Sequence, residues 1–586
     1  MRSFYRNNFR RSGLLSVLLS VLLVISLFSS FTLAAQNGAP KSSTTSASGS
    51  TDVGKKADAK KATSTLTPDE RKASARVKLE TIRDITTALS SKEFEGRGTA
   101  QPGADKAANY IADYFAKLGL KPAGDNGTYL QSIKFRSTQL LSESSVKVGD
   151  TELKHGDDYV LLPPYSSDQV NASGGVVFVG YGVESPELKR DDLAGLDLKG
   201  KVVVLMGGQP QGVDAAAWGR ATAPQIRAVS IFGRGAAAMI VANAGTAAQP
   251  FSTISNYLSR RRVGLASSPA AQFKIPPVLL VSDAAMEKIF AGSGTTYAQV
   301  FEKAKRGEAV SRDFGKNASV AIKIKIEEAP SSNVVAVLEG SDPKLKEEAV
   351  VYSAHYDAYG IDSSGRIFPG AADNALGTAT IMSIAEAFTK SFPKPESRPR
   401  RSIIFLAVTG EEYGLFGAEH WVGNPTWPLV KVAANINYDG IGTEVYGPVK
   451  RVVGFGAEHS DLGTVFEDVL AATGILVTPD PMPEENAFMR SDHYAFVKRG
   501  VPALMLMGGP EGDLATWLPR MKQWLATDYH STSDVVKPDW NWSGPQTLGQ
   551  VGMIIGLRVA NADAMPAWRS TSPYNKPRNA ARLSGH

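Results

Sequence analysis

The second half of the chain alternates between short apolar runs and segments with helical spacing, and this alternation limits the folds that the chain can adopt. The apolar runs are Ala349–Ser353, Ile403–Val408, Ala433–Tyr438 and Ala503–Met507, and helical segments follow Asp373 and Glu411. This order is typical of an α/β domain built around a mostly parallel sheet that is flanked by helices. Ligands of such sheets bind beyond the carboxyl ends of the strands, so the side chains that follow these runs are candidate functional residues.

Acidic and imidazole side chains occur at these strand ends and in a later polar segment. In chain order they are His355, Asp357, Asp373, Glu411, Glu412, Asp439 and His530. Five of them can serve as nitrogen or oxygen ligands of a metal, and one extra carboxylate stands beside a ligand in the pair Glu411-Glu412. A hydrolase with two metal ions needs such a set, because the free carboxylate can take a proton from the attacking water.

Each of these residues also has an ordinary structural explanation. Asp373 precedes a helix and could be its N-cap. The adjacent glutamates could form the solvated first turn of a helix, where the helix dipole favours acidic residues. Asp357 could form a surface pair with His355, or it could accept the second ring N–H of that histidine and fix its tautomer. The metal prediction therefore rests on the whole set occurring together.

The first half of the chain has two parts that differ in the spacing of their apolar residues. Residues 67–134 have helical spacing, with a helix expected from near Leu66 through Ile85 and another at Ala104–Leu118. Residues 135–328 contain short β-type runs separated by Gly and Pro, which predicts a β-rich unit inserted into the α/β domain. Within this unit we expect long polar loops at residues 209–226 and 244–266.

The ends of the chain differ from its interior. Residues 1–35 have a basic start and then a long apolar run, which predicts an export signal or a signal anchor that attaches the protein to a membrane. Residues 36–66 predict a flexible linker, and residues 567–586 a polar tail. We therefore expect an exported protein, periplasmic or extracellular. The net charge of +6 comes from these ends, so nothing predicts binding to nucleic acid, and the absence of cysteine excludes thiolate ligands.

The order of these motifs resembles peptidase family M28, whose members are co-catalytic zinc peptidases. The resemblance covers residues 67–134 and 329–566 and includes Gly96-Arg97-Gly98, Gly119-Leu120-Lys121-Pro122 and Arg490-Ser491-Asp492-His493. Residues 135–328, with Asp197-Leu198-Lys199-Gly200, resemble the protease-associated domain that many members carry as an insert. The family's mixed, mostly parallel sheet of the phosphorylase/hydrolase type is the fold that this resemblance implies.

The resemblance also implies roles for individual residues. Two zinc ions would be held by His355, Asp373, Glu412, Asp439 and His530, with Asp373 as the bridge. Glu411 would be the general base. Tyr529 would stabilise the oxyanion and Arg490 would contact the substrate, although a packed tyrosine and a surface arginine are equally ordinary explanations. His493 is expected to have a packing role.

The expected function is therefore that of an exported di-zinc aminopeptidase that removes amino-terminal residues from peptides. Two alternatives stay open. One is a glutamate-carboxypeptidase-like or dipeptidase activity. Carboxypeptidase relatives with the same insert carry a long helical dimerisation region after the last ligand, and Ser531–His586 is too short for it, which disfavours the carboxypeptidase. The other is a receptor or scaffold on a peptidase fold, which the complete ligand set disfavours. The place of the insert between the two parts of the main domain also suggests that it shapes or covers the cleft.

Overall fold

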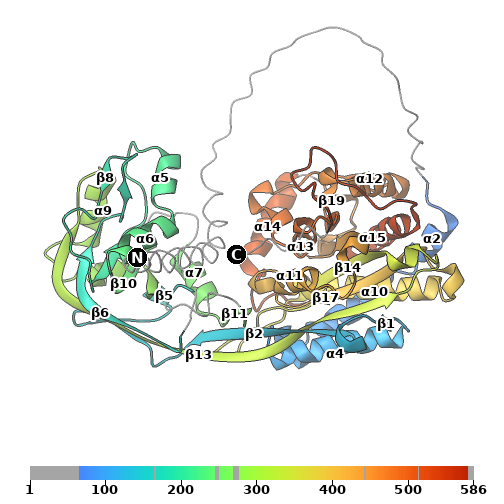
Figure 1. Ribbon diagram of the computed structural model, residues 1–586, viewed down its shortest axis with the longest axis horizontal. Helices are drawn as coiled ribbons and strands as arrows, with labels where there is room; N and C mark the ends of the chain where they lie inside the picture. Colours follow the sequence, from blue (N-terminus) through green and yellow to red (C-terminus); the bar gives the residue numbers. More distant parts are fainter. Residues whose placement is uncertain are drawn as a thin grey trace, which may run out of the picture.

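The computed structural model describes residues 65–163, 167–243, 250–267, 276–440, 444–512 and 514–578. These residues form two lobes joined by a long ribbon of strands (Figure 1). We call residues 65–129 and 339–578 the main lobe and residues 141–311 the inserted lobe. The predicted signal or anchor at residues 1–35 and nearly all of the predicted linker lie outside the described residues. Among the described helices, none is both long and apolar enough to cross a membrane.

A mixed sheet forms the centre of the main lobe. Its strands are, in spatial order, β20 (Leu476–Val477), β19 (Arg451–Phe455), β21 (Ala503–Gly508), β18 (Val432–Asn437), β14 (Ala349–His355), β17 (Ser402–Val408) and β13 (Arg312–Leu338). The central pairs β17–β14, β14–β18 and β18–β21 are parallel, whereas β13–β17 and β19–β21 are antiparallel. The predicted α/β class with a mostly parallel sheet is confirmed.

Helices cover both faces of this sheet, which explains why its strands are apolar along their whole length. One face packs against α2 (Pro68–Ser74), α3 (Leu79–Leu89), α4 (Pro102–Lys117), α10 (Leu376–Ser391), α12 (Leu462–Thr473) and α15 (Ser543–Asn561). The other face packs against α11 (Phe416–Gly423) and α13 (His493–Lys498). Along β14, Val350 and Tyr352 point to the first core and Val351 to the second, as the alternation of side chains in a strand requires. The helix α14 (Leu514–Thr527) packs in a smaller cluster with Met482.

The inserted lobe has its own sheet and core. Its strands are β3 (Ser145–Val148), β4 (Thr151–Leu153), β5 (Tyr159–Leu161), β6 (Gln169–Phe178), β9 (Val202–Leu205), β10 (Ala238–Ala242), β12 (Val278–Val281) and the first part of β13. Its helices are α5 (Ala215–Ala221), α6 (Pro224–Gly233), α7 (Phe251–Leu258), α8 (Asp283–Phe290) and α9 (Tyr297–Lys305). Short hairpins complete the two lobes: β7 (Glu184–Ser185) with β8 (Arg190–Asp191), and β15 (Gly360–Ile361) with β16 (Ile367–Phe368).

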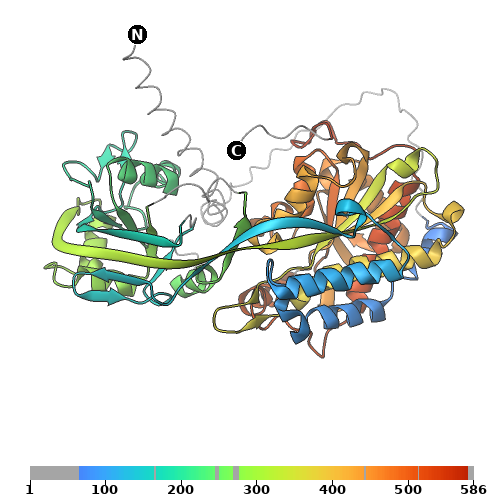
Figure 2. The same cartoon turned by 60° about the horizontal axis from the view of Figure 1, so that its bottom comes forward.

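Strand β13 runs through both lobes, as Figure 2 shows along the length of the molecule. It pairs with β6 and β3 in the inserted lobe and with β17 in the main lobe. Between the lobes it pairs with β2 (Leu130–Leu140), and β1 (Lys121–Pro122) pairs with its end. The boundaries predicted at residues 134/135 and 328/329 fall inside β2 and β13, so the two lobes share continuous strands.

Several predicted elements differ from the observed ones. The helix expected from Leu66 through Ile85 is two helices, α2 and α3, because the chain turns between Ala75 and Lys78. The loop expected at residues 209–226 contains α5, which Asp214 caps by accepting a hydrogen bond from the Ala217 N–H. The loop expected at residues 244–266 contains α7 and the strand β11 (Arg262–Leu265). Polar residues in these short elements obscured the periodicity that reveals longer ones.

Helix α15 lies directly on the tyrosines of the central strands. The hydroxyl of Tyr352 donates to the carbonyl of Gly552 at 2.9 Å, and the hydroxyl of Tyr438 donates to that of Leu548 at 3.1 Å. A Cβ atom at Gly552 would lie 1.7 Å from the Tyr438 hydroxyl oxygen. Glycine is required there because the helix approaches the sheet so closely.

Replacing Gly552 by alanine should therefore destabilise the main lobe. Overpacking of a close contact costs about 1–3 kcal/mol, and the free energy of unfolding should fall by that amount in a denaturant titration. Gln550→Ala, in the same helix but half-buried, is the control and should change the free energy by less than about 0.5 kcal/mol. Equal stability of Gly552→Ala and the wild type would contradict this account of the packing.

Candidate metal centre

The predicted ligand residues converge because their strands are parallel neighbours. In the register of the sheet, His355 at the end of β14 lies beside Val408 at the end of β17, and Ser353 lies beside Asn437 at the end of β18. The residues that follow these ends are Glu411 and Glu412 after β17 and Asp439 after β18. Asp373 enters from the turn before α10, and His530 from the segment after α14.

These side chains form two groups that share one carboxylate. In the first, His355 Nε2 lies 3.2 Å from Asp373 Oδ1 and 3.2 Å from Asp439 Oδ1. In the second, His530 Nε2 lies 3.2 Å from Asp373 Oδ2 and 3.0 Å from Glu412 Oε2. Within each group the three ligand atoms lie within 4.8 Å of one another. Asp373 thus presents one oxygen to each group, which is the arrangement of a bridging ligand.

Glu411 belongs to neither group but lies beside the first. Its Oε2 atom is 3.9 Å from His355 Nε2, and its side chain is 12% exposed. The turn Glu411–Tyr413 begins after Gly410, which has a left-handed φ of 73°. The backbone N–H of Glu411 donates to Asp357 Oδ1 at 3.2 Å. The backbone therefore directs two adjacent carboxylates to different places, one into a ligand group and one beside it.

The charges of the cluster are unbalanced. Burial raises the pKa of Glu411 well above its usual range, and the nearby Asp439 and Asp492 act in the same direction. Burial alone would lower the pKa of His355, but the carboxylates of Glu411 and Asp439 raise it well above its usual range. The same opposition, with Glu412 as the main carboxylate, raises the pKa of His530 to about 10. Carboxylates so close together favour a bound positive charge.

The donor set fits divalent metal ions. Each group offers one imidazole nitrogen and two carboxylate oxygens, which are common ligands of zinc. A cation at each group would supply the positive charge that the buried carboxylates need. Asp373, with an oxygen toward each group, is suited to hold two ions close together.

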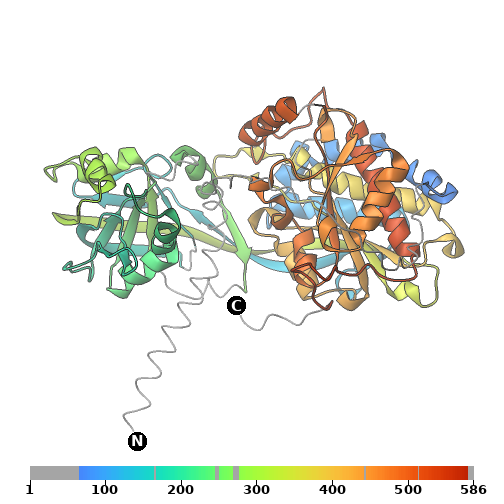
Figure 3. The same cartoon turned by 90° about the horizontal axis from the view of Figure 1, so that it is seen from above.

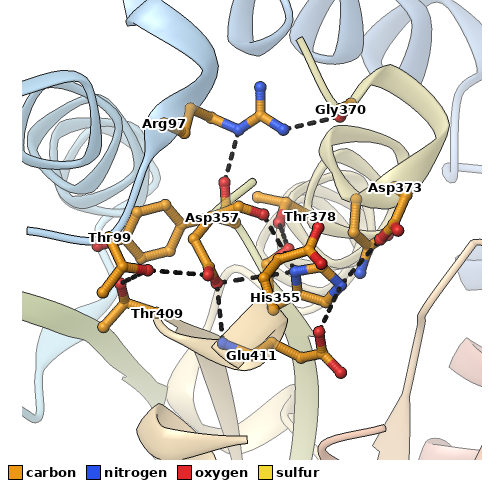
Figure 4. A network of polar contacts seen from close by, with 12 residues as sticks. Arg97, Thr99, His355, Asp357, Gly370, Asp373, Thr378, Thr409 and Glu411 are labelled. Carbon is orange, nitrogen blue, oxygen red and sulfur yellow. Dashed lines mark hydrogen bonds and ion pairs between the residues drawn. The ribbon is translucent and has the colours of Figure 1, made fainter. Parts of the chain in front are cut away.

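A hydrogen-bonded network holds the first group from behind (Figure 4). The Thr99 hydroxyl donates to Asp357 Oδ2 at 2.9 Å, and His355 Nδ1 lies 3.1 Å from the backbone carbonyl oxygen of Asp357. The Asp357 carboxylate is farther from that nitrogen, at 3.7 Å. The backbone carbonyl of Asp357 is therefore the nearer acceptor for the ring N–H of His355. The Asp357 carboxylate accepts hydrogen bonds from the Thr99 hydroxyl and the Glu411 N–H.

Arg97 ties this network to the turn that carries Asp373. Its guanidinium is fully buried and donates to four backbone carbonyls, those of Leu89, Tyr356, Pro369 and Gly370, over 2.5–2.7 Å. Burial lowers the pKa of Arg97 to about 10, so the group stays charged at neutral pH. The guanidinium thus joins the end of α3, the end of β14 and the turn before α10.

Asp534 holds the backbone of the shared ligand. Its two carboxylate oxygens accept the N–H groups of Ala372 at 2.9 Å and of Asp373 at 3.0 Å. On the other side of the turn, the Asn374 side chain donates to the Tyr438 carbonyl and accepts the Gly377 N–H. These contacts leave the turn little freedom, and so they fix the direction of the Asp373 side chain.

The remaining predicted residues lie around the second group. The ring of Tyr529 stacks on that of His530 with 3.6 Å between centroids, and Arg490 Nη2 lies 3.4 Å from the Tyr529 hydroxyl. Arg490 also pairs with Glu485 at 3.2 Å. His493 is fully buried and packs against the ring of Phe488, which agrees with a packing role. The structure thus brings all the predicted residues to one region.

Sequence reasoning assigned no role to several residues that surround this region. Asp534, Thr99 and Thr409 surround the predicted residues, and Asp492 is buried near Glu411. The spacing of Asp534 from His530, four residues in a polar segment, was the available signal. The location of Thr99 had no signal, since it depends on the docking of a segment more than 250 residues away from Asp357.

The part of the chain that carries this region matches a known protein family. Residues 333–553 match the model of peptidase family M28. The chain carries an M28 peptidase domain. The predicted resemblance to this family is thereby confirmed, and the matched residues include every predicted ligand, Glu411, Tyr529 and Arg490.

Curated relatives match parts of the chain. A probable zinc metalloprotease of Leptosphaeria maculans is 38% identical over 114 residues, which are 19% of this chain and 25% of the relative. Leucine aminopeptidase 2 of Arthroderma otae is 30% identical over 197 residues, which are 32% of this chain and 35% of the relative. The chain thus spans only about a quarter to a third of the length of these relatives.

A solved structure has a similar fold over most of the chain. It is that of the aminopeptidase from Aneurinibacillus sp. strain AM-1, with a TM-score of 0.53 and 17% sequence identity. The match covers 87% of this chain and 98% of that chain. Because the identity is low, this likeness supports the fold alone.

Arg97→Lys should destabilise the chain and disturb the Asp373 turn. A lysine has one donor centre, so it leaves buried carbonyls of Leu89, Pro369 or Gly370 without a donor. Each unsatisfied buried group costs about 1–3 kcal/mol, and we expect the free energy of unfolding to fall by roughly 2–4 kcal/mol. Arg83→Lys, at a side chain that is 46% exposed, is the matched control and should leave it unchanged. A denaturant titration of both variants makes the comparison.

Proposed function

We propose that the protein is a di-zinc aminopeptidase that removes amino-terminal residues from peptides. The observation that carries the proposal is the pair of ligand groups joined by Asp373, with Glu411 beside them and outside both. The match to the M28 model and the names of the curated relatives support zinc and peptide substrates. His355 and Asp439 would hold one ion, Glu412 and His530 the other, and Asp373 both.

The residues around the ions divide the work of peptide hydrolysis. When bound, the zinc ions supply Lewis acidity that makes water a better acid and polarises the scissile carbonyl. Glu411 accepts the proton of the attacking water, because its carboxylate lies beside the first ligand group and belongs to neither group. The same carboxyl then donates that proton to the leaving amine. Its burial and neighbours, which disfavour a free negative charge, help it to hold the proton between the two events.

Tyr529 and Arg490 are assigned to the substrate. Burial raises the pKa of Tyr529 well above its usual range, so its hydroxyl remains a donor at neutral pH. A hydroxyl held by the stacking of its ring on His530 can donate to the oxyanion that forms at the carbonyl. Arg490, whose side chain is 44% exposed, is placed beside Tyr529 to contact the substrate backbone.

The proposed place of action follows from the amino-terminal sequence. Residues 1–35 have the basic and apolar parts of an export signal, which makes extracellular or periplasmic peptides the proposed substrates. If the segment is retained, it would attach the protein to a membrane.

A panel of aminoacyl-anilides, each free and amino-acetylated, tests the proposal. We expect the zinc-loaded protein to cleave only the free-amine forms, because an aminopeptidase site recognises the amino group. Chelation should abolish cleavage and zinc should restore it. Two bound ions without cleavage would favour a carboxypeptidase or dipeptidase, and the absence of bound metal would favour a scaffold.

Glu411→Gln tests the assignment of the general base. The variant should still bind two zinc ions, because Glu411 is not a ligand, while kcat should fall by about 10²–10⁴-fold through loss of the proton acceptor. The matched control is Glu484→Gln, the same change at an exposed position, which should keep full activity. A near-normal kcat in Glu411→Gln would show that another group takes the proton.

A further inference from the structure

One segment of the inserted lobe reaches back to the metal centre. After α7 the chain forms β11, which lies at the junction of the two lobes (Figures 1 and 3). β11 pairs antiparallel with β2, with Arg262 opposite Thr138 and Leu265 opposite Phe135. The segment is therefore held by the same ribbon that joins the lobes.

An apolar cluster secures this segment against the main lobe. Val263 of β11 packs with the buried side chains of Ile133 and Phe135, and Tyr413 and Phe416 pack against the same cluster. Tyr413 directly follows the predicted ligand Glu412 in the chain. The inserted lobe thus contacts the turn that presents both glutamates of the centre.

Arg261 adds polar contacts at the same place. Its Nη1 and Nη2 atoms donate to the carbonyls of Thr99 and Ala100, each at 2.9 Å. Thr99 is the residue whose hydroxyl donates to Asp357. Arg261 therefore binds the segment to the hydrogen-bonded network of Thr99 and Asp357 that supports the first ligand group.

Arg260 contacts the backbone of His530, a residue of the second ligand group. Its Nη2 atom donates to the backbone carbonyl of His530 at 2.9 Å. Its guanidinium also lies 4.6 Å from the ring centroids of both Tyr359 and Phe368. The Tyr359 hydroxyl is in turn 3.2 Å from His530 Nδ1. Arg260 thus supports His530 directly at its backbone and, through Tyr359, at its ring.

His530 needs such support because its backbone is strained. Its φ is 56°, in the left-handed region that residues other than glycine seldom adopt. Such a conformation costs about 1–3 kcal/mol and persists only where the surroundings impose it. From this conformation the ring directs Nε2 at Glu412 and Asp373. Without the bond from Arg260, the backbone of His530 would lose a contact that opposes the strain.

We propose that Arg260 of the inserted lobe is a positioning residue for the metal centre formed by Asp373, Glu412 and His530, and that the inserted lobe thereby sets the affinity of this centre for its ion. The inference rests on the proposed function for the presence of metal there. Arg260 acts through the backbone carbonyl of His530 and the ring of Tyr359, and not through a ligand atom. The other centre, with His355 and Asp439, has no contact of this kind with Arg260.

The coupling works in both directions. If docking of the Arg260 segment strengthens metal binding, then metal binding strengthens docking by the same factor. Residues that support a metal ligand commonly change metal affinity by about 10–100-fold. A change of that size is enough for an unloaded protein to hold its inserted lobe less firmly than a loaded one.

Zinc binding by Arg260→Ala and Arg260→Lys in the full chain tests the proposal. We expect Arg260→Ala to bind one of its two zinc ions about 10–100-fold more weakly in competition with a chelator. Arg260→Lys, which keeps a charged donor but not the planar group that stacks on two rings, should lose less. Arg220→Ala, at an arginine of the inserted lobe that is 63% exposed, is the matched control and should bind like the wild type. Thermal unfolding of each variant checks that the fold is retained.

Crystals of Arg260→Ala at limiting zinc identify the weakened centre by anomalous scattering. Loss of the ion at Glu412 and His530, with the other retained, supports the proposal. Equal affinity of variant and wild type for both ions, or loss of the ion at His355 instead, overturns it. If the wild type itself binds no zinc, the proposed function fails, and that outcome is distinct from a variant that binds as the wild type does.

Discussion

The mutual repulsion of buried carboxylates is the constraint on which the rest of the site depends. Asp373, Glu411, Glu412 and Asp439 lie together beyond the carboxyl ends of the central parallel strands, and both histidines there have pKa values raised by these neighbours. Such a cluster is unfavourable in a folded protein unless positive charge lies among the carboxylates. A pair of metal ions meets this requirement and also supplies the chemistry proposed for the site. The residues that require a nearby positive charge are thus the same residues that the proposed catalysis uses.

Rigid supports around the cluster keep the carboxylates in place. Arg97 joins three backbone segments, and Asp534 holds the N–H groups of the turn at Asp373. The inserted lobe adds a third support through Arg260 and His530. Asp534 and Arg260 contact the backbone of predicted ligand residues, and Arg97 contacts the backbone of neighbouring segments; none of these contacts uses a ligand atom. Ligands that are held in this way need little rearrangement when they bind an ion.

The predictable part of the fold consists of long elements with strong periodicity. The strands that end at His355, Val408 and Asn437 are buried on both faces. Their unbroken apolar runs allowed the strands to be predicted from the sequence. By contrast, the sequence predicts a polar loop where α7 and β11 lie, because these elements are short and the charged residues Arg260 and Arg261 stand between them. Their role depends on contacts with β2, Thr99 and His530, which lie up to 270 residues away in the chain. No local pattern encodes such contacts.

The sequence by itself determined which residues are candidates for the site. The types of the candidate ligand residues and their places after apolar strands predicted a hydrolase with two metal ions, because parallel strands bring such residues to one edge, and the resemblance to family M28 implied a peptidase. Only the tertiary structure decided how these residues lie relative to one another. It placed Asp373 between the two groups, set Glu411 apart from Glu412, and brought Arg260 from the inserted lobe to His530. The physical reason is that these relations are distances between atoms on separate elements, which depend on how the elements pack and not on their local sequence.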